Sequence, residues 1–312
     1  MPDRRALLIA NRHSRTGDRD LSAALEVLSA GGISVLERQC RRSDEVGGVI
    51  RSDGGEVDLV VLAGGDGTMN AAAEALLARQ LPLGILPTGT GNDLARTLKL
   101  PTDLVKAAAT IVDGHQHRID LGRANRKHFF NAASIGLAAE VTRHHSAERK
   151  RRLWLLAYVL SVRDAWRTTR AFRVRLRCDG RALRLRALQV TVGNGRHYGG
   201  GMTVRADAAI DDGWLDVYVL KPRRFWRLLL LFPALRFGWL DRSEAVLALR
   251  ARTVEVGTGR PLPVNTDGEL TTSTPARFTV VPRALSVFVP APDQSSGGAD
   301  GRAVERAADR VE

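Results

Sequence analysis

Two short glycine-rich segments carry the residues that are best suited to chemistry. The first is Gly64-Gly65-Asp66-Gly67-Thr68, and the second is Thr88-Gly89-Thr90-Gly91-Asn92-Asp93. Glycine lets a ligand approach the backbone closely, and the N–H groups at the start of a helix favour an anion. The pattern therefore predicts a phosphate site, with threonine hydroxyls as further donors. No Walker A lysine follows either segment, which excludes a P-loop enzyme.

Asp66 would repel a phosphate beside it unless a cation lay between the two. Mg²⁺ commonly joins carboxylates to substrate phosphates. We therefore expect Asp66 to hold a catalytic Mg²⁺, with Asp93 and Asp120 as further candidates. A structural role for Asp120 is equally compatible with its place near the end of a predicted strand.

Alternating strands and helices must position these segments. Apolar strands are predicted at 58–63 and 83–86, directly before the two glycine segments, and helices at 69–79 and 94–98 after them. Further strands are predicted at 5–10 and 33–36, and further helices at 21–30, 44–51 and 101–113. This order predicts a doubly wound parallel sheet whose strand ends bring both segments, and a polar turn after Asn11, to one edge.

The pattern changes after residue 123, where strands predominate. They are predicted at 128–133, 172–177, 182–192, 215–220, 253–256, 278–281 and 285–289, with one long helix at 147–167. Arginines alternate with apolar residues over 171–179, as on a strand with one solvated face. We expect one domain at 1–123, a β-rich domain at 124–284, a last strand at 285–290 that returns to the first domain, and a disordered tail at 291–312.

The net charge of +13 indicates attraction to phosphates, whether in nucleotides, anionic lipids or nucleic acid. The two cysteines, Cys40 and Cys178, match no metal or redox spacing, which fits a reducing cytosol. The start of the chain lacks the apolar stretch of a signal peptide, and the run 228–235 is too short to span a membrane. The segment 225–240, rich in aromatic residues and arginine, fits either an interfacial segment or a core helix.

Six motifs together resemble one known family. They lie, in order, at 64–70, 87–96, 130–136, 192–201, 208–217 and 267–269. The sequence resembles the diacylglycerol kinase catalytic family, and in particular the bacterial YegS-like lipid kinases. The resemblance covers nearly all of the chain except the tail.

The resemblance implies an α/β nucleotide domain, a β-sandwich-like second domain, and ATP-dependent phosphorylation of a lipid hydroxyl. It implies that Glu269, or its neighbour Asp267, accepts the proton of that hydroxyl; we favour Glu269. A structural Mg²⁺, or Ca²⁺, is implied at Asp212 and the backbone carbonyls of Ala209 and Trp214. With the glycine segments, the resemblance gives the following ATP-binding residues: Asn11, Arg12, His13, Ser14, Arg15, Gly65, Asp66, Gly67, Thr68, Met69, Asn70, Ala71, Thr90, Asn92 and Asp93.

Three positions depart from the family pattern. Arg12 stands where proline is frequent, Ala71 where glutamate is usual, and Gln39-Cys40 where a nucleotide-contacting threonine often lies. These changes indicate a divergent member that keeps its carboxylates. We expect a cytoplasmic enzyme of phospholipid metabolism that acts on diacylglycerol or phosphatidylglycerol, with peripheral contact at the inner membrane face and no nucleic acid partner.

Two alternatives stay open from the sequence. One is a small-molecule kinase that resembles NAD kinases, which share a GGDG turn. The other is a non-catalytic protein that binds anionic lipid. The oligomeric state is left open.

Overall fold

The computed structural model describes residues 4–11, 18–137, 170–198, 202–203, 208–222 and 245–291. The predicted helix at 147–167, the segment 225–240, the turn residues Arg12 to Arg15 and the tail from 292 lie outside these residues. Among the helices that are described, none is both long and apolar enough to cross a bilayer.

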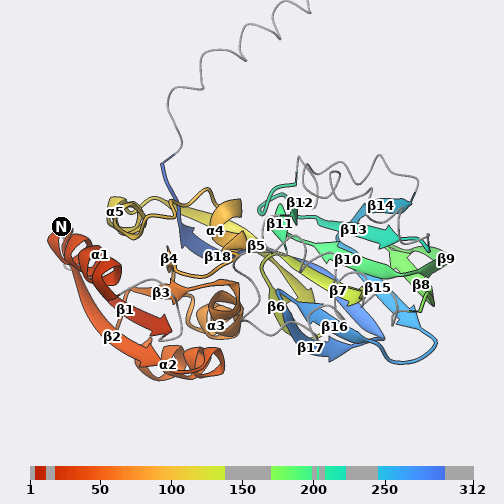
Figure 1. Cartoon of the computed structure of the whole chain (residues 1–312), viewed down its shortest axis with the longest axis horizontal. Helices are drawn as coiled ribbons and strands as arrows, with labels where there is room; N and C mark the ends of the chain where they lie inside the picture. Colours follow the sequence, from red (N-terminus) through yellow and green to blue (C-terminus); the bar gives the residue numbers. More distant parts are fainter. Residues whose placement is uncertain are drawn as a thin grey trace, which may run out of the picture.

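The first half is a parallel sheet covered by helices on both faces (Figure 1). Its strands run in the order β2-β1-β3-β4, and all neighbouring pairs are parallel. Helices α1 and α5 pack on one face through Ala24, Leu28 and Ile111, and α2, α3 and α4 pack on the other. The predicted doubly wound sheet is therefore confirmed. The elements are β1 (Arg4–Asn11), α1 (Asp18–Ala30), β2 (Ile33–Cys40), η1 (Ser43–Glu45), α2 (Val46–Asp53), β3 (Leu59–Gly64), α3 (Asp66–Arg79), β4 (Leu83–Pro87), α4 (Asp93–Thr97) and α5 (Leu104–Asp113).

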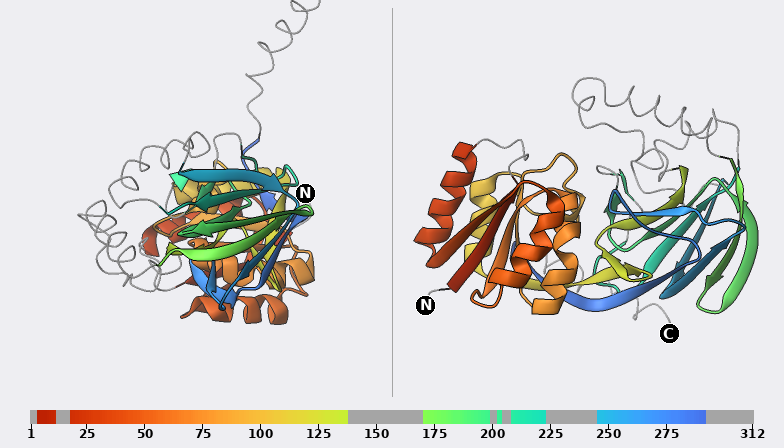
Figure 2. Two further views of the ribbon diagram at one scale, coloured as in Figure 1. Left: turned by 90° about the vertical axis from the view of Figure 1, so that its right-hand side faces the viewer. Right: turned by 90° about the horizontal axis from the view of Figure 1, so that it is seen from below.

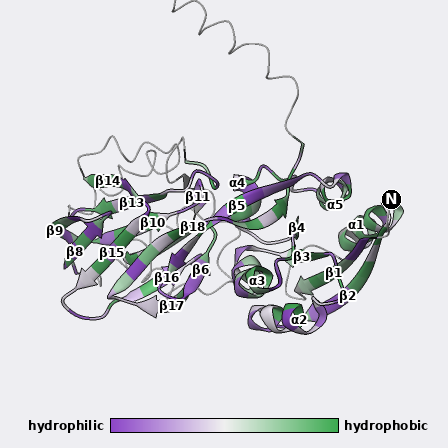
Figure 3. Cartoon of the chain, turned by 180° about the vertical axis from the view of Figure 1, so that it is seen from behind, coloured by the Kyte–Doolittle hydropathy of each residue, from purple (hydrophilic) through white to green (hydrophobic). Residues whose placement is uncertain are grey.

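The second half is a sandwich of two sheets. One is an antiparallel sheet in the order β14-β13-β10-β7-β16-β17. It faces β18, β15, β8 and β9, which belong to the same large, 10-stranded sheet as the parallel strands of the first half. Valines from both layers and Phe278 fill the core between them. Along β8, buried residues alternate with exposed ones, and hydrophobic residues alternate with hydrophilic ones (Figure 3). The β-sandwich-like second half is thus confirmed. Its strands are β5 (Gln116–Ala124), β6 (Lys127–Phe129), β7 (Ala132–Gly136), β8 (Phe172–Cys178), β9 (Arg181–Ala187), β10 (Gln189–Gly193), β11 (His197–Tyr198), β12 (Met202–Thr203), β13 (Leu215–Leu220), β14 (Val246–Ala251), β15 (Thr253–Thr258), β16 (Pro263–Thr266), β17 (Glu269–Ser273) and β18 (Ala276–Phe288).

Strands β5 and β18 run through both halves and join them (Figure 2, right). The start of β18 pairs with β15 of the sandwich, whereas Val287 near its end pairs in parallel with Leu83 of β4. The strands predicted at 278–281 and 285–289 are therefore one strand, with an irregularity between Val281 and Leu285. A continuous sheet fixes the two halves relative to each other.

The strand predicted over 182–192 is instead two strands in different sheets. β9 pairs with β8 in the large sheet, and β10 pairs with β7 and β13 in the other. Leu188, which is buried, lies at the crossing. The sequence does not signal this crossing, because no glycine, proline, asparagine or aspartate lies between the two strands.

Candidate active site

The two glycine segments touch each other at the carboxyl ends of β3 and β4. The Thr88 N–H donates to the Gly64 carbonyl at 3.2 Å. A Cβ placed on Gly89 would lie 2.4 Å from the Gly65 Cα, so only glycine fits this contact. Gly65 is the residue before α3, which begins at Asp66, three residues earlier than predicted. The first turn of α3 therefore contains Asp66, Gly67 and Thr68. The Thr68 N–H donates to the Gly65 carbonyl at 2.9 Å, whereas the described residues offer no acceptor to the N–H groups of Asp66 and Gly67, as is usual at the start of a helix.

Asp66 and Asn92 hold the two segments in place. The Asp66 Oδ1 accepts the Leu94 N–H at 3.1 Å, which links the start of α3 to the start of α4. The Asn92 side-chain amide donates to the carbonyls of Gly89 at 2.9 Å and Pro87 at 3.3 Å. The described residues donate no hydrogen bond to the second Asp66 oxygen. One oxygen thus orders the loops, and the other stays available for a cation.

The remaining residues predicted to bind ATP fall into three groups. Thr68, Met69 and Asp93 are buried, and Met69 belongs to the core beneath α3. Gly67, Asn70 and Ala71 are half-buried on the first turns of α3, and Thr90 is exposed at the second glycine segment. Asn11 ends β1, in register with Cys40 of β2. All described members therefore lie at or beside one edge of the parallel sheet.

A hairpin from the second half lies over the start of α3. β16 and β17 are joined by Asp267 and Gly268, both with positive φ, as a two-residue hairpin turn requires. The Asn70 side chain donates to the Thr266 carbonyl at 3.1 Å. A Cβ on Gly67 would lie 3.7 Å from the Glu269 Oε1. The hairpin therefore brings Glu269 to the first turn of α3.

The Asp267 carboxylate is fully engaged by backbone. It accepts the N–H groups of Phe130 at 2.7 Å, Asn131 at 2.9 Å and Ala132 at 3.1 Å. Burial raises the pKa of Asp267 to about 7, the three N–H donors act in the opposite direction, and the charge of Asp66 adds to the rise. With both oxygens occupied, Asp267 anchors the hairpin.

Glu269 differs from Asp267 in both exposure and partners. It is exposed, and the described residues give its carboxylate no hydrogen bond or ion pair. Partial burial of the carboxylate and the charge of Asp44 raise its pKa, while Lys127 lowers it. No local pattern indicates a role for Asp44 or Lys127, because they come from η1 and β6, far from Glu269 along the chain.

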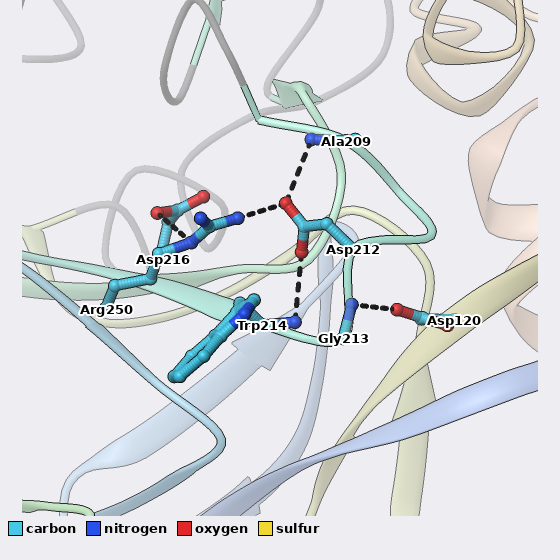
Figure 4. A network of polar contacts seen from close by, with 7 residues as sticks. All are labelled: Asp120, Ala209, Asp212, Gly213, Trp214, Asp216 and Arg250. Atoms are coloured by element: carbon cyan, nitrogen blue, oxygen red, sulfur yellow. Dashed lines mark hydrogen bonds and ion pairs between the residues drawn. The ribbon is translucent and has the colours of Figure 1, made fainter.

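The residues predicted to hold a structural metal lie on the turn before β13 (Figure 4). Asp212 there accepts the Trp214 N–H at 3.0 Å and forms an ion pair with Arg250. Asp120 accepts the N–H groups of Gly213 at 2.6 Å and Arg283 at 2.7 Å, so it links this turn to β18. In the described part of the chain, no three residues among His, Cys, Asp and Glu form a cluster that could hold a metal.

Comparisons with known proteins give concordant results. The model described as "Diacylglycerol kinase catalytic domain" matches residues 5–124, and the model described as "YegS C-terminal NAD kinase beta sandwich-like domain" matches residues 131–289. A diacylglycerol kinase of Bacillus subtilis (strain 168) is 30% identical over 238 residues, which cover 75% of this chain and 78% of that protein.

Two further matches extend this result. A diacylglycerol kinase of Staphylococcus carnosus (strain TM300) is 27% identical over 237 residues, covering 75% of this chain and 78% of that protein. A crystal structure of a proposed diacylglycerol kinase of Bacillus anthracis str. Sterne superposes with a TM-score of 0.78 at 28% identity. That superposition covers 92% of this chain and 95% of the other chain.

Proposed function

The chain belongs to the diacylglycerol kinase catalytic family and is therefore a lipid kinase, and we propose that it transfers the γ-phosphate of ATP to a hydroxyl of diacylglycerol or phosphatidylglycerol. One observation carries the residue assignment. The Glu269 carboxylate, which has no partner among the described residues, lies beside Gly67 at the start of a helix that is suited to phosphate. A proton acceptor and a phosphate site thus come from different halves of the chain and face each other.

The first turn of α3 and the Gly89 segment hold the phosphates of ATP in this proposal. Backbone N–H groups at the start of α3 donate to phosphate oxygens. The close contact of Gly65 with Gly89 lets the backbone of both segments lie along these oxygens. Mg²⁺ fits at Asp66, because that ion is usually held by one or two carboxylates together with substrate phosphates. The ion would neutralise charge on the transferred group.

Glu269 takes the proton of the lipid alcohol. As the alcohol oxygen attacks the γ-phosphorus, its O–H proton moves to the Glu269 carboxylate. The bond from the γ-phosphorus to the bridging oxygen breaks, and ADP leaves with that electron pair. Asp267 positions the hairpin that carries Glu269, since its own oxygens are held by three N–H groups.

We assign ATP to the α/β half, residues 1–123, and the lipid to the β-rich half, residues 124–284. The end of β18 pairs with β4, which supports the expectation that the last strand, at 285–290, returns to the first half. ATP and a membrane lipid meet at the inner face of the membrane, which supports a cytoplasmic location with peripheral membrane contact.

A transfer assay tests this function. Purified protein is incubated with γ-labelled ATP, Mg²⁺ and a panel of diacylglycerol, phosphatidylglycerol, a sphingoid base and NAD. We expect label in one of the lipids and none in NAD, and loss of that label in Asp66→Asn. Label in NAD alone would select the small-molecule kinase. No transfer to any acceptor by protein that still binds anionic vesicles would select a non-catalytic lipid-binding protein.

The pH dependence of the rate should respond to the charges beside Glu269. The base acts only when ionised, so the rate falls as the pH drops through its pKa, which is raised above the ordinary value. Asp44 contributes to that rise, and Lys127 opposes it. We therefore expect Asp44→Asn to move the acid limb of kcat to lower pH and Lys127→Gln to move it to higher pH. Identical acid limbs in both variants would contradict the assignment of Glu269.

An exposed arginine face supports the proposed contact with an anionic membrane. On β8 and β9, Arg173 lies opposite Arg186 and Arg175 opposite Arg184, and all four are exposed. Like charges directly opposite each other destabilise a sheet. Glu255 on the neighbouring strand pairs with Arg177 at 3.6 Å. An anionic surface would relieve the repulsion, and acidic lipid is the surface that a lipid kinase meets.

Removing two of these arginines should have opposite effects on binding and on stability. Each basic residue near an anionic surface contributes about 1 kcal/mol, so the double variant Arg175→Gln/Arg184→Gln should bind phosphatidylglycerol vesicles roughly thirtyfold more weakly. Its thermal stability should rise slightly, because the cross-strand repulsion is removed. Sedimentation with vesicles and thermal unfolding measure the two effects. The charge-matched control is Arg41→Gln/Arg51→Gln; equal binding by the two double variants would exclude this face.

A further inference from the structure

The turn that precedes β13 is held by a cation that belongs to the chain itself. Arg250 on β14 forms an ion pair with the Asp212 Oδ2, and its Nε lies 3.7 Å from the Asp216 Oδ1 (Figure 4). Asp216 and Arg250 are direct partners in the register of β13 and β14. The pairing of the two strands thus delivers the guanidinium to both carboxylates.

Each oxygen of the Asp212 carboxylate also accepts a backbone N–H group. Its Oδ1 accepts the Trp214 N–H at 3.0 Å, and its Oδ2 accepts the Ala209 N–H at 3.4 Å. Mg²⁺ and Ca²⁺ need six or more oxygen ligands and would displace the guanidinium from the oxygen it contacts. The residues as arranged therefore do not fit the structural metal that the family resemblance implies at Asp212, Ala209 and Trp214.

Trp214 gives the guanidinium a third contact. The Arg250 Cζ lies 5.7 Å from the centre of the Trp214 ring, and the Arg252 Cζ lies 4.8 Å from it. Cations over an indole face are attracted to its electron density. The Trp214 ring therefore holds two arginines beside Asp212, and their positive charge disfavours a divalent ion there.

We propose that Arg250 replaces the structural metal of this turn, so that the fold of the turn does not depend on Mg²⁺ or Ca²⁺. The turn also contacts the strands that connect the two halves of the chain. Its Gly213 N–H and the Arg283 N–H, at the irregularity of β18, both donate to the buried Asp120 carboxylate. Arg250 therefore acts as a positioning residue for the strands that join the two halves, and the inference does not depend on which lipid is the substrate.

Thermal unfolding without nucleotide tests the proposal. The wild-type melting temperature should be the same in EDTA, Mg²⁺ and Ca²⁺. Arg250→Ala removes the guanidinium that lies beside Asp212 and Asp216, so its melting temperature should fall in EDTA and recover in part with Ca²⁺ or Mg²⁺. Adding Asp212→Asn to Arg250→Ala should abolish that recovery. Arg252→Ala is the matched control, because Arg252 stacks on the same ring; its response to metal should equal that of the wild type.

Two results would overturn the proposal. The first is a wild-type melting temperature that rises with Mg²⁺ or Ca²⁺ and no longer rises in Asp212→Asn, since a metal would then be the natural occupant. The second is an Arg250→Ala variant that is as stable as the wild type and insensitive to metal. Should Arg250→Ala fail to fold, Arg250→Lys and the wild type carry the test; the lysine variant should fold and remain insensitive to metal.

Discussion

Replacing Glu269 with glutamine is expected to lower kcat by about 10²- to 10⁴-fold, the range that general base catalysis contributes. Glutamine keeps the size of the side chain but cannot accept the proton of the lipid alcohol. Glu269 is exposed and has no hydrogen-bond partner among the described residues, so the substitution removes no contact that stabilises the fold. Steady-state phosphate transfer at saturating ATP and lipid measures the effect.

Two controls separate chemistry from folding in this experiment. Glu255→Gln makes the same change on a half-buried residue of β15 and should keep kcat within twofold of the wild type. The dissociation constant for ATP should be nearly unchanged in Glu269→Gln, because the proposed phosphate site lies in the other half of the chain. Normal turnover by Glu269→Gln would exclude it as the base and would leave Asp267 as the candidate.

Gly89→Ala should reduce kcat/KM for ATP by about 10²-fold, the cost of displacing reacting groups by about 1 Å. The new methyl group would lie 2.4 Å from the Gly65 Cα and 2.7 Å from the Asn92 Oδ1. Since the first of these atoms belongs to the backbone, the two glycine segments must move apart. We also expect a loss of about 1–3 kcal/mol in the free energy of unfolding, as in other overpacked sites.

Gly48→Ala is the control: it makes the same substitution at a site where we expect no loss of activity or stability. A Cβ at Gly48 meets nothing within 4 Å, and the residue lies inside α2. Alanine is favoured over glycine in a helix by about 0.5–1 kcal/mol, so this variant should be slightly more stable and fully active. Wild-type kcat/KM for ATP in Gly89→Ala would show that the contact between the segments has no role in holding phosphate.

The edge of the parallel sheet could be predicted because its signals are local. Each glycine segment follows a short apolar strand and precedes a helix, and parallel strands carry such turns to one edge. The contact of Gly65 with Gly89 and the bond from Leu94 to Asp66 agree with that reasoning. The start of α3 was predicted too late, since Asp66 and Gly67 are poor helix formers that a helix tolerates in its first turn.

The relation between the two halves could not be predicted in the same way. That β18 is one strand running through both halves depends on its pairing with β5, which comes from the middle of the chain. The Asp-Gly turn at 267–268 does signal a hairpin, but nothing local indicates that Asp267 is anchored at 130–132. Arg250 reaches Asp212 only through the register of β13 and β14.

The most direct test is a crystal structure with a non-hydrolysable ATP analogue, Mg²⁺ and wild-type protein. We expect the γ-phosphate at the first turn of α3, between the Gly65 and Gly89 segments, with the Glu269 carboxylate facing it. A γ-phosphate bound elsewhere on the chain, or bound at α3 with Glu269 turned away from it and Asp267 alone facing it, would contradict the account.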